Sequence, residues 1–197
     1  MVEVSAARTW WRSAAGLRQQ RNWRSRGGRF VGSNRVQRLL VSAARSAWRI
    51  VRADRAKHAF TGDGSRLLGG RWNSRGVAVI YASEHESLAA LELLVHTMPL
   101  SPLDRFLSFR IEWNDRLTEY FPVAQLPTDW NSEVPTTATQ RIGDDWVHER
   151  RTAVLAVPAV LSTSELNFLL NPTHPDFKRI KIGKPIEYRF EPRLLGR

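Results

Sequence analysis

Three side chains that could carry out chemistry lie within 22 residues of one another near the middle of the chain. Arg71 stands in the run Gly69–Asn73, Tyr81 follows it, and Glu92 comes last. A guanidinium can hold phosphate oxygens through two parallel bonds, and glycines beside it let a ligand approach the backbone. A fixed carboxylate can stabilise positive charge that develops on a sugar ring. Together these side chains can hold a dinucleotide and cleave its glycosidic bond.

The first two of these residues need a loop and a strand to position them. The glycine-rich stretch 62–70 predicts a loop that leads into Arg71. Residues 77–81 form an apolar run rich in β-branched side chains, which is typical of a buried strand. Tyr81 ends that strand, and on the residues alone it reads as an ordinary core tyrosine with a satisfied hydroxyl.

The third residue is expected on a helix over residues 83–96, which stops before Pro99. Ser83 and Glu86 have the spacing of a capping box at its start. The predicted apolar stripe of this helix consists of Leu88, Leu91 and Val95. Glu92 lies on the border of that stripe, where a carboxylate is costly unless it is paired. Arg71 is a candidate partner for Glu92. The alternative is that Glu92 is half-exposed and pairs with a neighbouring residue.

Further short elements surround these three. We expect strands at residues 48–51, 106–113, 153–157, 178–182 and 186–190. We expect a helix at 137–149, weakened by Gly143, and irregular segments at 122–135 and 165–177. Short strands with intervening helices and no regular alternation predict an α+β domain, a mixed β-sheet core with flanking helices, over residues 47–197.

The charge of the chain is concentrated in its first segment. The net charge is +11, and residues 1–46 hold ten arginines against one acid, Glu3, giving +9. The remainder, 47–197, has 20 basic and 18 acidic residues, giving +2. A nearly neutral globular part argues against a nucleic-acid-binding fold for the whole.

Two interpretations of residues 1–46 stay open. The arginines, with Trp10, Trp11 and Trp23, could form a flexible arm that binds RNA or DNA by charge and stacking. Alternatively the segment is an extension unimportant to the fold, or the product of a start codon placed too early, with Val36 or Val41 as the true start.

Composition and spacing exclude several other kinds of site. The chain has no cysteine, which rules out disulfides and thiolate chemistry and fits a cytoplasmic location. No apolar run reaches the roughly 20 residues of a membrane span. The histidines show no metal-ligand spacing, so we expect no metal, and His174 between two prolines is predicted to stabilise a turn.

Five blocks of the sequence, in order and at suitable spacing, resemble the RES-domain family of bacterial toxins. The resemblance covers about residues 47–193. Its blocks are Trp48-Arg49-Ile50; Gly69–Asn73 with Tyr81; Ala90–His96 with Glu92; Gly143–Trp146; and Asn167–Phe177.

The resemblance implies a fold related to ADP-ribosyltransferases and a role as the toxin of a toxin–antitoxin pair. Such a toxin would deplete NAD by cleaving the nicotinamide–ribose bond, through hydrolysis or phosphorolysis. Transfer of ADP-ribose to a host protein is the alternative reaction. The partner implied is an antitoxin with a helix-turn-helix DNA-binding domain, through which nucleic acid would be contacted indirectly.

The resemblance also assigns roles to single residues. It makes Arg71, Tyr81 and Glu92 the catalytic set, with Arg71, Asn73 and Tyr81 in contact with NAD. Tyr81 would stack on the nicotinamide ring or donate to the ribose. Asn73 could bond either the turn or the ligand, and Trp72 is expected in the core.

The chain departs from the family pattern at one position. The family typically has a serine directly after the Val-Pro that ends its late strand, and here Val157-Pro158 is followed by Ala159. Ser162 could contribute a hydroxyl, but from another place. The departure leaves open a catalytically impaired, RES-like binding module.

Overall fold

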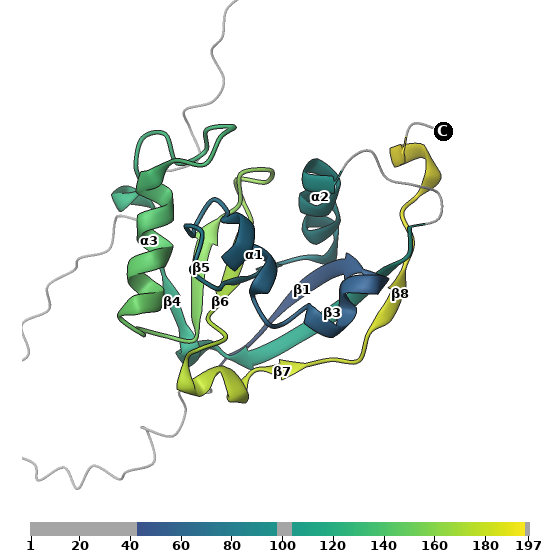
Figure 1. The fold of residues 1–197 in the computed structure, drawn as a ribbon, viewed down its shortest axis with the longest axis horizontal. Helices are drawn as coiled ribbons and strands as arrows, with labels where there is room; N and C mark the ends of the chain where they lie inside the picture. Colours follow the sequence, from purple (N-terminus) through teal and green to yellow (C-terminus); the bar gives the residue numbers. More distant parts are fainter. Residues whose placement is uncertain (1–42, 98–103, 196–197) are drawn as a thin grey trace, which may run out of the picture. The chain divides into compact units, whose positions relative to one another are not determined.

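One mixed sheet organises the protein. The computed structural model describes residues 43–97 and 104–195, and the strands within these ranges run in the order β4-β5-β6-β2-β1-β3-β7, with β8 also beside β3 (Figure 1). Their bounds are β1 Ala44–Arg52, β2 Ile80–Ser83, β3 Phe106–Asn114, β4 Thr118–Tyr120, β5 Val154–Pro158, β6 Leu166–Leu170, β7 Lys181–Ile182 and β8 Ile186–Tyr188. The paired strands are antiparallel except β4 and β5, which are parallel. The predicted α+β class with a mixed sheet is therefore confirmed.

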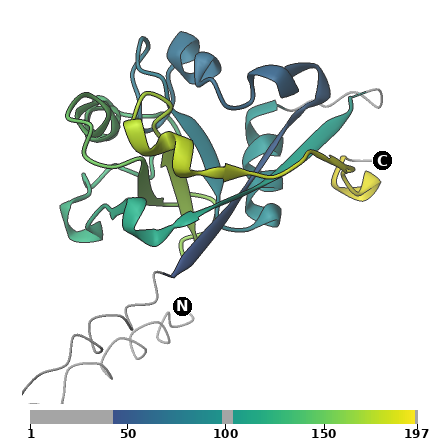
Figure 2. The ribbon, with the colours of Figure 1, turned by 90° about the horizontal axis from the view of Figure 1, so that it is seen from below.

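Within the described ranges, three α-helices and several 3-10 turns join the strands. The α-helices are α1 Asp63–Leu68, α2 Glu86–Thr97 and α3 Thr137–His148. The 3-10 turns are η2 Ala53–His58, η3 Asp115–Leu117, η4 Val123–Gln125, η5 Pro175–Arg179 and η6 Pro192–Leu195. Figure 1 shows α2 beside β1, and α3 at the other end of the sheet near β4 and β5. Figure 2 shows β7 crossing the molecule from η5 toward the C-terminal turn.

The sheet buries side chains on both faces. Beneath α2 and α3, Ile50 and Phe106 pack with Ala89 and Ala90 of α2, while Leu155 and Leu169 pack with Trp146 of α3. The opposite face holds a second cluster built around Ala47, Ile80, Ile111 and Phe168. Strand β5 is buried along its whole length. Its sequence is therefore a continuous apolar run, as is usual for strands that are covered on both faces.

The elements expected around the site differ from the structure in four respects. Short α1 occupies the predicted loop, and β2 begins and ends later than the run 77–81. Ser83 does not cap a helix, because it is the buried last residue of β2 and α2 starts at Glu86. The fourth difference is β6, which lies inside the segment predicted to be irregular.

The predicted apolar stripe of α2 is confirmed at Leu88 and wrong at Leu91 and Val95. Leu91 and Val95 are 44% and 61% exposed, whereas the helix face toward the sheet carries Leu88, Ala89 and Ala90. Alanines fit there because the helix lies close to β1, and a stripe drawn only through large side chains misses them.

Two strands diverge at the centre of the sheet. In the described part of the chain β1 meets β2 at one residue pair, Trp48 with Ser83. Arg49 lies in the gap, donating from Nε to the carbonyl of Ala59 at 2.8 Å and from Nη1 to the carbonyl of Tyr81 at 2.6 Å. Burial lowers the pKa of Arg49 to about 10. The side chain thus replaces ladder bonds that the diverging strands cannot make.

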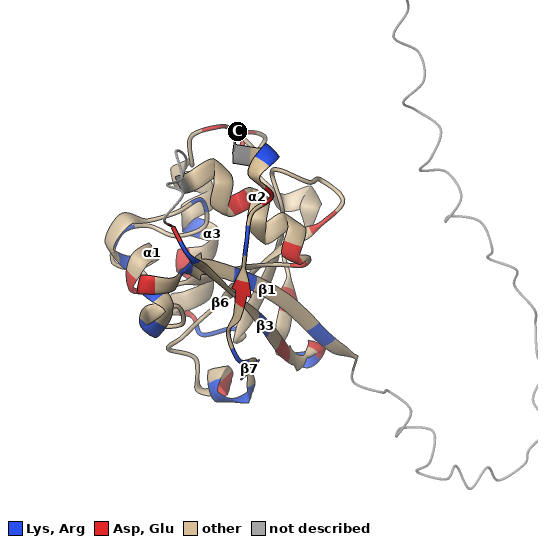
Figure 3. Ribbon diagram, turned by 90° about the vertical axis from the view of Figure 1, so that its right-hand side faces the viewer, with Lys and Arg blue, Asp and Glu red and all other residues tan. Residues whose placement is uncertain are grey.

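Charged residues of both signs are interspersed over the described part of the protein (Figure 3). This distribution agrees with the near-neutral balance of residues 47–197. The arginine-rich arm predicted for residues 1–46 lies almost entirely outside the described residues, and β1 begins at Ala44. Among the helices described, none has the length and apolar character needed to cross a membrane.

Candidate active site

The turn that carries Arg71 is closed by its own backbone and by a buried asparagine. Gly70 N donates to the carbonyl of Asn73 at 2.8 Å, and Gly69 adopts a φ of +74°. Asn73 is completely buried, and its Nδ2 lies 3.0 Å from the carbonyls of Ser65 and Val77. These bonds hold the turn against α1 and the segment before β2. A direct contact of Asn73 with NAD stays a prediction.

Tyr81 locks the same turn from the strand side. Its hydroxyl donates to Asn73 Oδ1 at 2.7 Å and accepts from the amide of Trp72 at 3.1 Å. A Cβ on Gly70 would stand 2.6 Å from the tyrosine oxygen, so a side chain at that position would disrupt the contact. Burial raises the pKa of the Tyr81 hydroxyl, which stays protonated as the geometry requires.

Helix α3 supports the turn from the other side, through one face. Gln140 Nε2 donates to the carbonyl of Gly70 at 3.1 Å, and Asp144 Oδ1 accepts from Ser74 N at 2.9 Å. Between them a Cβ on Gly143 would lie 1.7 Å from the carbonyl oxygen of Trp72. Residues three and four apart share a helix face, so these contacts form one docking surface. The glycine that weakened the helix prediction is what allows the turn to approach.

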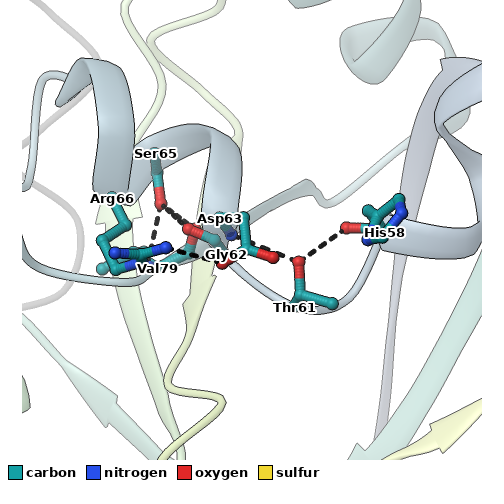
Figure 4. A network of polar contacts seen from close by, with 7 residues as sticks. All are labelled: His58, Thr61, Gly62, Asp63, Ser65, Arg66 and Val79. Carbon is teal, nitrogen blue, oxygen red and sulfur yellow. Dashed lines mark hydrogen bonds and ion pairs between the residues drawn. The ribbon is translucent and has the colours of Figure 1, made fainter.

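A network at α1 fixes the chain that leads into β2 (Figure 4). Ser65 Oγ accepts from Val79 N at 2.9 Å and lies 2.6 Å from the carbonyl of the same residue. Thr61 Oγ1 donates to the carbonyl of His58 and accepts from Asp63 N, which ties the start of α1 to the preceding turn. The network therefore fixes where β2 begins and, with it, the position of Tyr81 in that strand.

Arg71 is half-buried and bonds a loop far away in the sequence. Its Nη1 donates to the carbonyl of Trp130 at 2.9 Å, and the Trp130 ring stacks on Trp72 with centroids 6.5 Å apart. Within the described part of the chain, Arg71 forms no ion pair with a carboxylate. A guanidinium held by a neutral carbonyl keeps its full positive charge available to an anionic ligand.

Glu92 is held by two side chains, one from β6 and one from its own helix. Asn167 Nδ2 donates to Glu92 Oε1 at 2.7 Å, and His96 Nε2 lies 3.7 Å from Glu92 Oε2. Burial raises the pKa of Glu92, but the bonds from His96 and Asn167 and the charge of Arg71 outweigh it and lower that pKa below its usual value. The bond to Glu92 in turn raises the pKa of His96. Glu92 is therefore a carboxylate at neutral pH.

The three residues singled out in the sequence lie within electrostatic reach of one another. The charge of Arg71 lowers the pKa of Glu92, of Tyr81 and of His96, although it is not the largest cause in any of them. The carboxylate of Glu92 raises the pKa of Tyr81. A cation, a carboxylate and an aromatic ring from a turn, a helix and a strand thus share one region. The expected direct pair between Arg71 and Glu92 is not among the ion pairs of the described residues.

Several supporting residues were missed by the sequence reasoning. Asn167 was quoted only as part of a family block, and no role was predicted for Gln140, Asp144 or Trp130. Their contacts to the site span from 59 to 75 residues of sequence, so no local pattern marks them. The regular i, i+3, i+4 spacing of the α3 face was the one available signal.

The position that lacks the family serine lies at the end of β5, two residues after Val157, which pairs with Asn167 of β6. Ala159 follows β5 directly and is fully buried, with its amide bonded to the carbonyl of Glu165. The side chain of Ser162 bonds Glu165 and lowers the pKa of that carboxyl.

The turn predicted at His174 is present. His174 Nδ1 accepts from Asp176 N at 3.0 Å at the start of η5, and Nε2 lies 3.2 Å from the carbonyl of Arg150. Among the described residues no group of three or more His, Cys, Asp or Glu side chains could hold a metal ion.

Comparison with known proteins identifies the family of this chain. The model of the RES domain family matches residues 46–191. The chain is 38% identical over 156 residues to the Prs ADP-ribosylating toxin of Sphingobium sp. (strain YBL2), covering 76% of this chain and 96% of that protein. It is 37% identical over 148 residues to Toxin Res of Yersinia enterocolitica, covering 75% and 97%, and 34% identical to Toxin Res of Photorhabdus laumondii over 149 residues, covering 75% and 96%. The chain belongs to the RES domain family.

Proposed function

We propose that this protein is an enzyme that consumes NAD by cleaving the nicotinamide–ribose bond, and that it acts as the toxin of a toxin–antitoxin pair. The observation that carries the proposal is the ionised, doubly held carboxylate of Glu92 within reach of the Arg71 charge. Relatives that are 37% and 34% identical are named as Res toxins, and one that is 38% identical is named as an ADP-ribosylating toxin.

Glu92 would stabilise the transition state. When the bond between the ribose C1′ and the nicotinamide nitrogen breaks, its electron pair goes to the nicotinamide ring, which becomes neutral. The ribose then carries positive charge shared between C1′ and the ring oxygen, as in glycoside hydrolysis. A carboxylate fixed beside the ribose hydroxyls lowers the energy of that state without a metal, because its charge is already in place.

Arg71 and Tyr81 would hold the two ends of the substrate. The guanidinium of Arg71 is bonded to one neutral carbonyl, and a pyrophosphate oxygen is a stronger acceptor that can replace it. The hydroxyl of Tyr81 is engaged in the turn, so the ring face is the part of this side chain that serves as a platform for nicotinamide. Asn73 would act mainly by holding Tyr81, in addition to the contact with NAD proposed from the sequence.

The reaction is completed when an acceptor attacks C1′. Water forms ADP-ribose and inorganic phosphate forms ADP-ribose 1″-phosphate, the acceptor losing a proton to solvent in either case. We propose this degradation as the main reaction, in the cytoplasm, with release of nicotinamide.

The proposal is tested by following NAD with purified wild-type protein and with Glu92→Gln. The amide keeps the shape of the side chain and can still accept from Asn167, but it has no charge. We expect kcat/KM to fall about 10²- to 10³-fold, the usual effect of removing one electrostatic stabiliser. Glu86→Gln, the same change in the first turn of the same helix, should leave the rate within about twofold. Wild-type protein that leaves NAD unchanged would refute the proposal.

A second reaction is favoured by the name of one relative, the ADP-ribosylating toxin of Sphingobium. The same bond would break, and a protein nucleophile would take the place of water or phosphate. NAD labelled in the adenylate part, incubated with protein and cell lysate, separates the two. Labelled protein bands support transfer, whereas free labelled ADP-ribose or its phosphate without labelled bands supports degradation.

The impaired-module alternative depends on Ala159, and it is tested by restoring the hydroxyl. If the missing serine limits turnover, Ala159→Ser should raise the rate of NAD loss at least tenfold. Equal rates in the two proteins mean that the hydroxyl is dispensable here.

The partner that we propose is an antitoxin with a helix-turn-helix domain that covers the region of Arg71 and Glu92, and co-expression should abolish NAD loss.

A further inference from the structure

A short relay of hydrogen bonds connects the sheet to the carboxylate of Glu92. Ser83 Oγ donates to Asn167 Oδ1 at 2.8 Å, and Asn167 Nδ2 donates to Glu92 Oε1 at 2.7 Å. Ser83 and Asn167 are paired residues of β2 and β6, so their side chains stand on the same face of the sheet, and Glu92 reaches that face from α2. The three residues come from three elements.

The relay has a direction. An amide has an acceptor at one end and donors at the other, and a hydroxyl that donates to the oxygen end leaves the nitrogen end facing the carboxylate. Ser83 is 4% exposed, so water does not readily replace it as that donor. An amide does not take up a proton in the range where carboxylates titrate, and Asn167 therefore remains a donor whatever the pH.

We propose that Asn167, oriented by Ser83, is the positioning residue that fixes the Glu92 carboxylate and keeps it ionised for NAD cleavage. The inference rests on the proposed function, because it concerns the same site. Asn167 does not touch the reacting atoms; it acts through Glu92.

Two other groups, His96 and Arg71, act on Glu92, and Tyr81 lies within electrostatic reach of it, but none of the three makes this bond. His96 lies one turn along α2, but its side chain is 75% exposed and 3.7 Å away. Arg71 acts by its charge only, since its bond goes to the carbonyl of Trp130. Tyr81 uses its hydroxyl within the turn. Asn167 is thus the close, half-buried donor among the groups that the structure describes around Glu92.

The decisive variant is Asn167→Asp, which keeps the shape and places two carboxyl groups at the distance of the present bond. Such a pair binds one proton strongly, so the acid limb of the kcat profile should move up by at least about one pH unit. At the midpoint of the wild-type acid limb we expect kcat to be at least about fivefold below wild type, while KM for NAD changes less than about threefold. Recovery at higher pH distinguishes this from misfolding, which no pH restores.

Two further variants make the test specific. Ser83→Ala frees the Asn167 amide to rotate. We expect the acid limb of the kcat profile to move to higher pH, but by less than in Asn167→Asp. Asn114→Asp makes the same chemical change at the end of β3, where the side chain accepts from Arg116 N and an aspartate can do so equally. It should keep the wild-type profile.

A second measurement needs no activity. In protein labelled with ¹³C at the glutamate carboxyl, the resonance that disappears in Glu92→Gln reports the titration of this group. Its pKa should be higher in Asn167→Asp and in Ser83→Ala than in wild type. An unchanged Glu92 pKa in folded Ser83→Ala and Asn167→Asp would overturn the inference while leaving NAD cleavage intact. If wild-type protein does not cleave NAD, the proposed function fails, and the titration still decides whether Asn167 controls Glu92.

Discussion

At the scale of single residues, the site separates side chains that hold the turn from side chains free to meet a ligand. Asn73 and the hydroxyl of Tyr81 use their polar atoms on the turn itself, whereas Arg71 bonds one neutral carbonyl and Glu92 stays ionised. The division matters because a substitution in the first group acts through structure and one in the second acts through chemistry.

Tyr81→Phe tests this division. The change leaves the ring but deprives Asn73 Oδ1, which is completely buried, of its donor, and leaves the amide of Trp72 without an acceptor. A buried polar atom without a partner costs about 1–3 kcal/mol. We therefore expect the free energy of unfolding to fall by about 2 kcal/mol, with KM for NAD changed less than about threefold, since the ring remains.

Tyr120→Phe is the matched control. Its hydroxyl also donates to a side-chain oxygen, that of Asp115, but the residue is 41% exposed, so water can take over the bond. Its loss should cost less than about 0.5 kcal/mol. Urea titrations measure both variants. A Tyr81→Phe protein as stable as wild type, or one with a large rise in KM, would mean that the hydroxyl faces the substrate.

The sequence indicated candidate site residues but not the bonds around them. Arg71, Tyr81 and Glu92 could be selected because their types, their order and a family motif point to one chemistry. Asn167 could not, since nothing near it in the chain indicates that it faces a carboxylate 75 residues away. Such a contact depends on the pairing of β2 with β6, which is a property of the sheet.

At the scale of elements, helices and strands were predictable where the local sequence pattern was strong. Helix α3 was predicted almost to its bounds, and Thr136 caps it by accepting from Thr139 N. Strand β3 was predicted to within a residue of its bounds, and it alternates buried and exposed residues from Phe109 to Trp113. Strand β6 was missed because its five residues stand between a polar loop and Pro172, and the prolines that follow drew the whole segment into an irregular prediction.

Gly143→Ala tests the docking of α3 on the Arg71 turn. The new methyl would lie 1.7 Å from the carbonyl oxygen of Trp72, so helix and turn must move apart by more than an ångström. Overpacking of this kind costs about 1–3 kcal/mol or more, and alanine's better helix propensity returns only about 1 kcal/mol. We expect stability to fall by at least about 1 kcal/mol and NAD cleavage to fall at least tenfold, because Arg71 moves with the turn.

Gly64→Ala supplies the control for that measurement. Gly64 lies in α1, and a Cβ built there meets nothing within 4 Å. The same substitution should leave activity unchanged and raise stability slightly, up to about 0.5–1 kcal/mol. Thermal unfolding and the NAD assay on the two glycine variants therefore separate close approach from helix propensity. If both variants behave alike, α3 does not press on the turn.

At the scale of the whole molecule, charge and fold are divided along the chain. Residues 1–46 carry a net charge of +9 and the rest of the chain carries +2. The match to the RES domain covers residues 46–191, and β1 begins at Ala44. Residues Val41–Arg197 form a compact unit by themselves. That unit carries Arg45 in addition to residues 47–197, and therefore a net charge of +3. The domain that holds the site is thus expected to fold without the preceding segment.

A chain of residues 41–197 should therefore match the full chain in midpoint of thermal unfolding, within about 2 °C, and in kcat/KM for NAD, within about twofold. Binding to a duplex oligonucleotide should differ. Basic residues that neutralise phosphates release counterions, so the affinity of the full chain should fall steeply with salt, with a slope near −0.9 for each phosphate contacted. The shorter chain should bind weakly at all salt concentrations. Equal oligonucleotide binding by both would place the basic surface within the domain, and loss of folding in the shorter chain would make residues 1–40 part of the structure. If neither happens, the proposed NAD cleavage is independent of any nucleic-acid contact, because most of the charges that could make that contact lie outside the unit to which we assign the reaction.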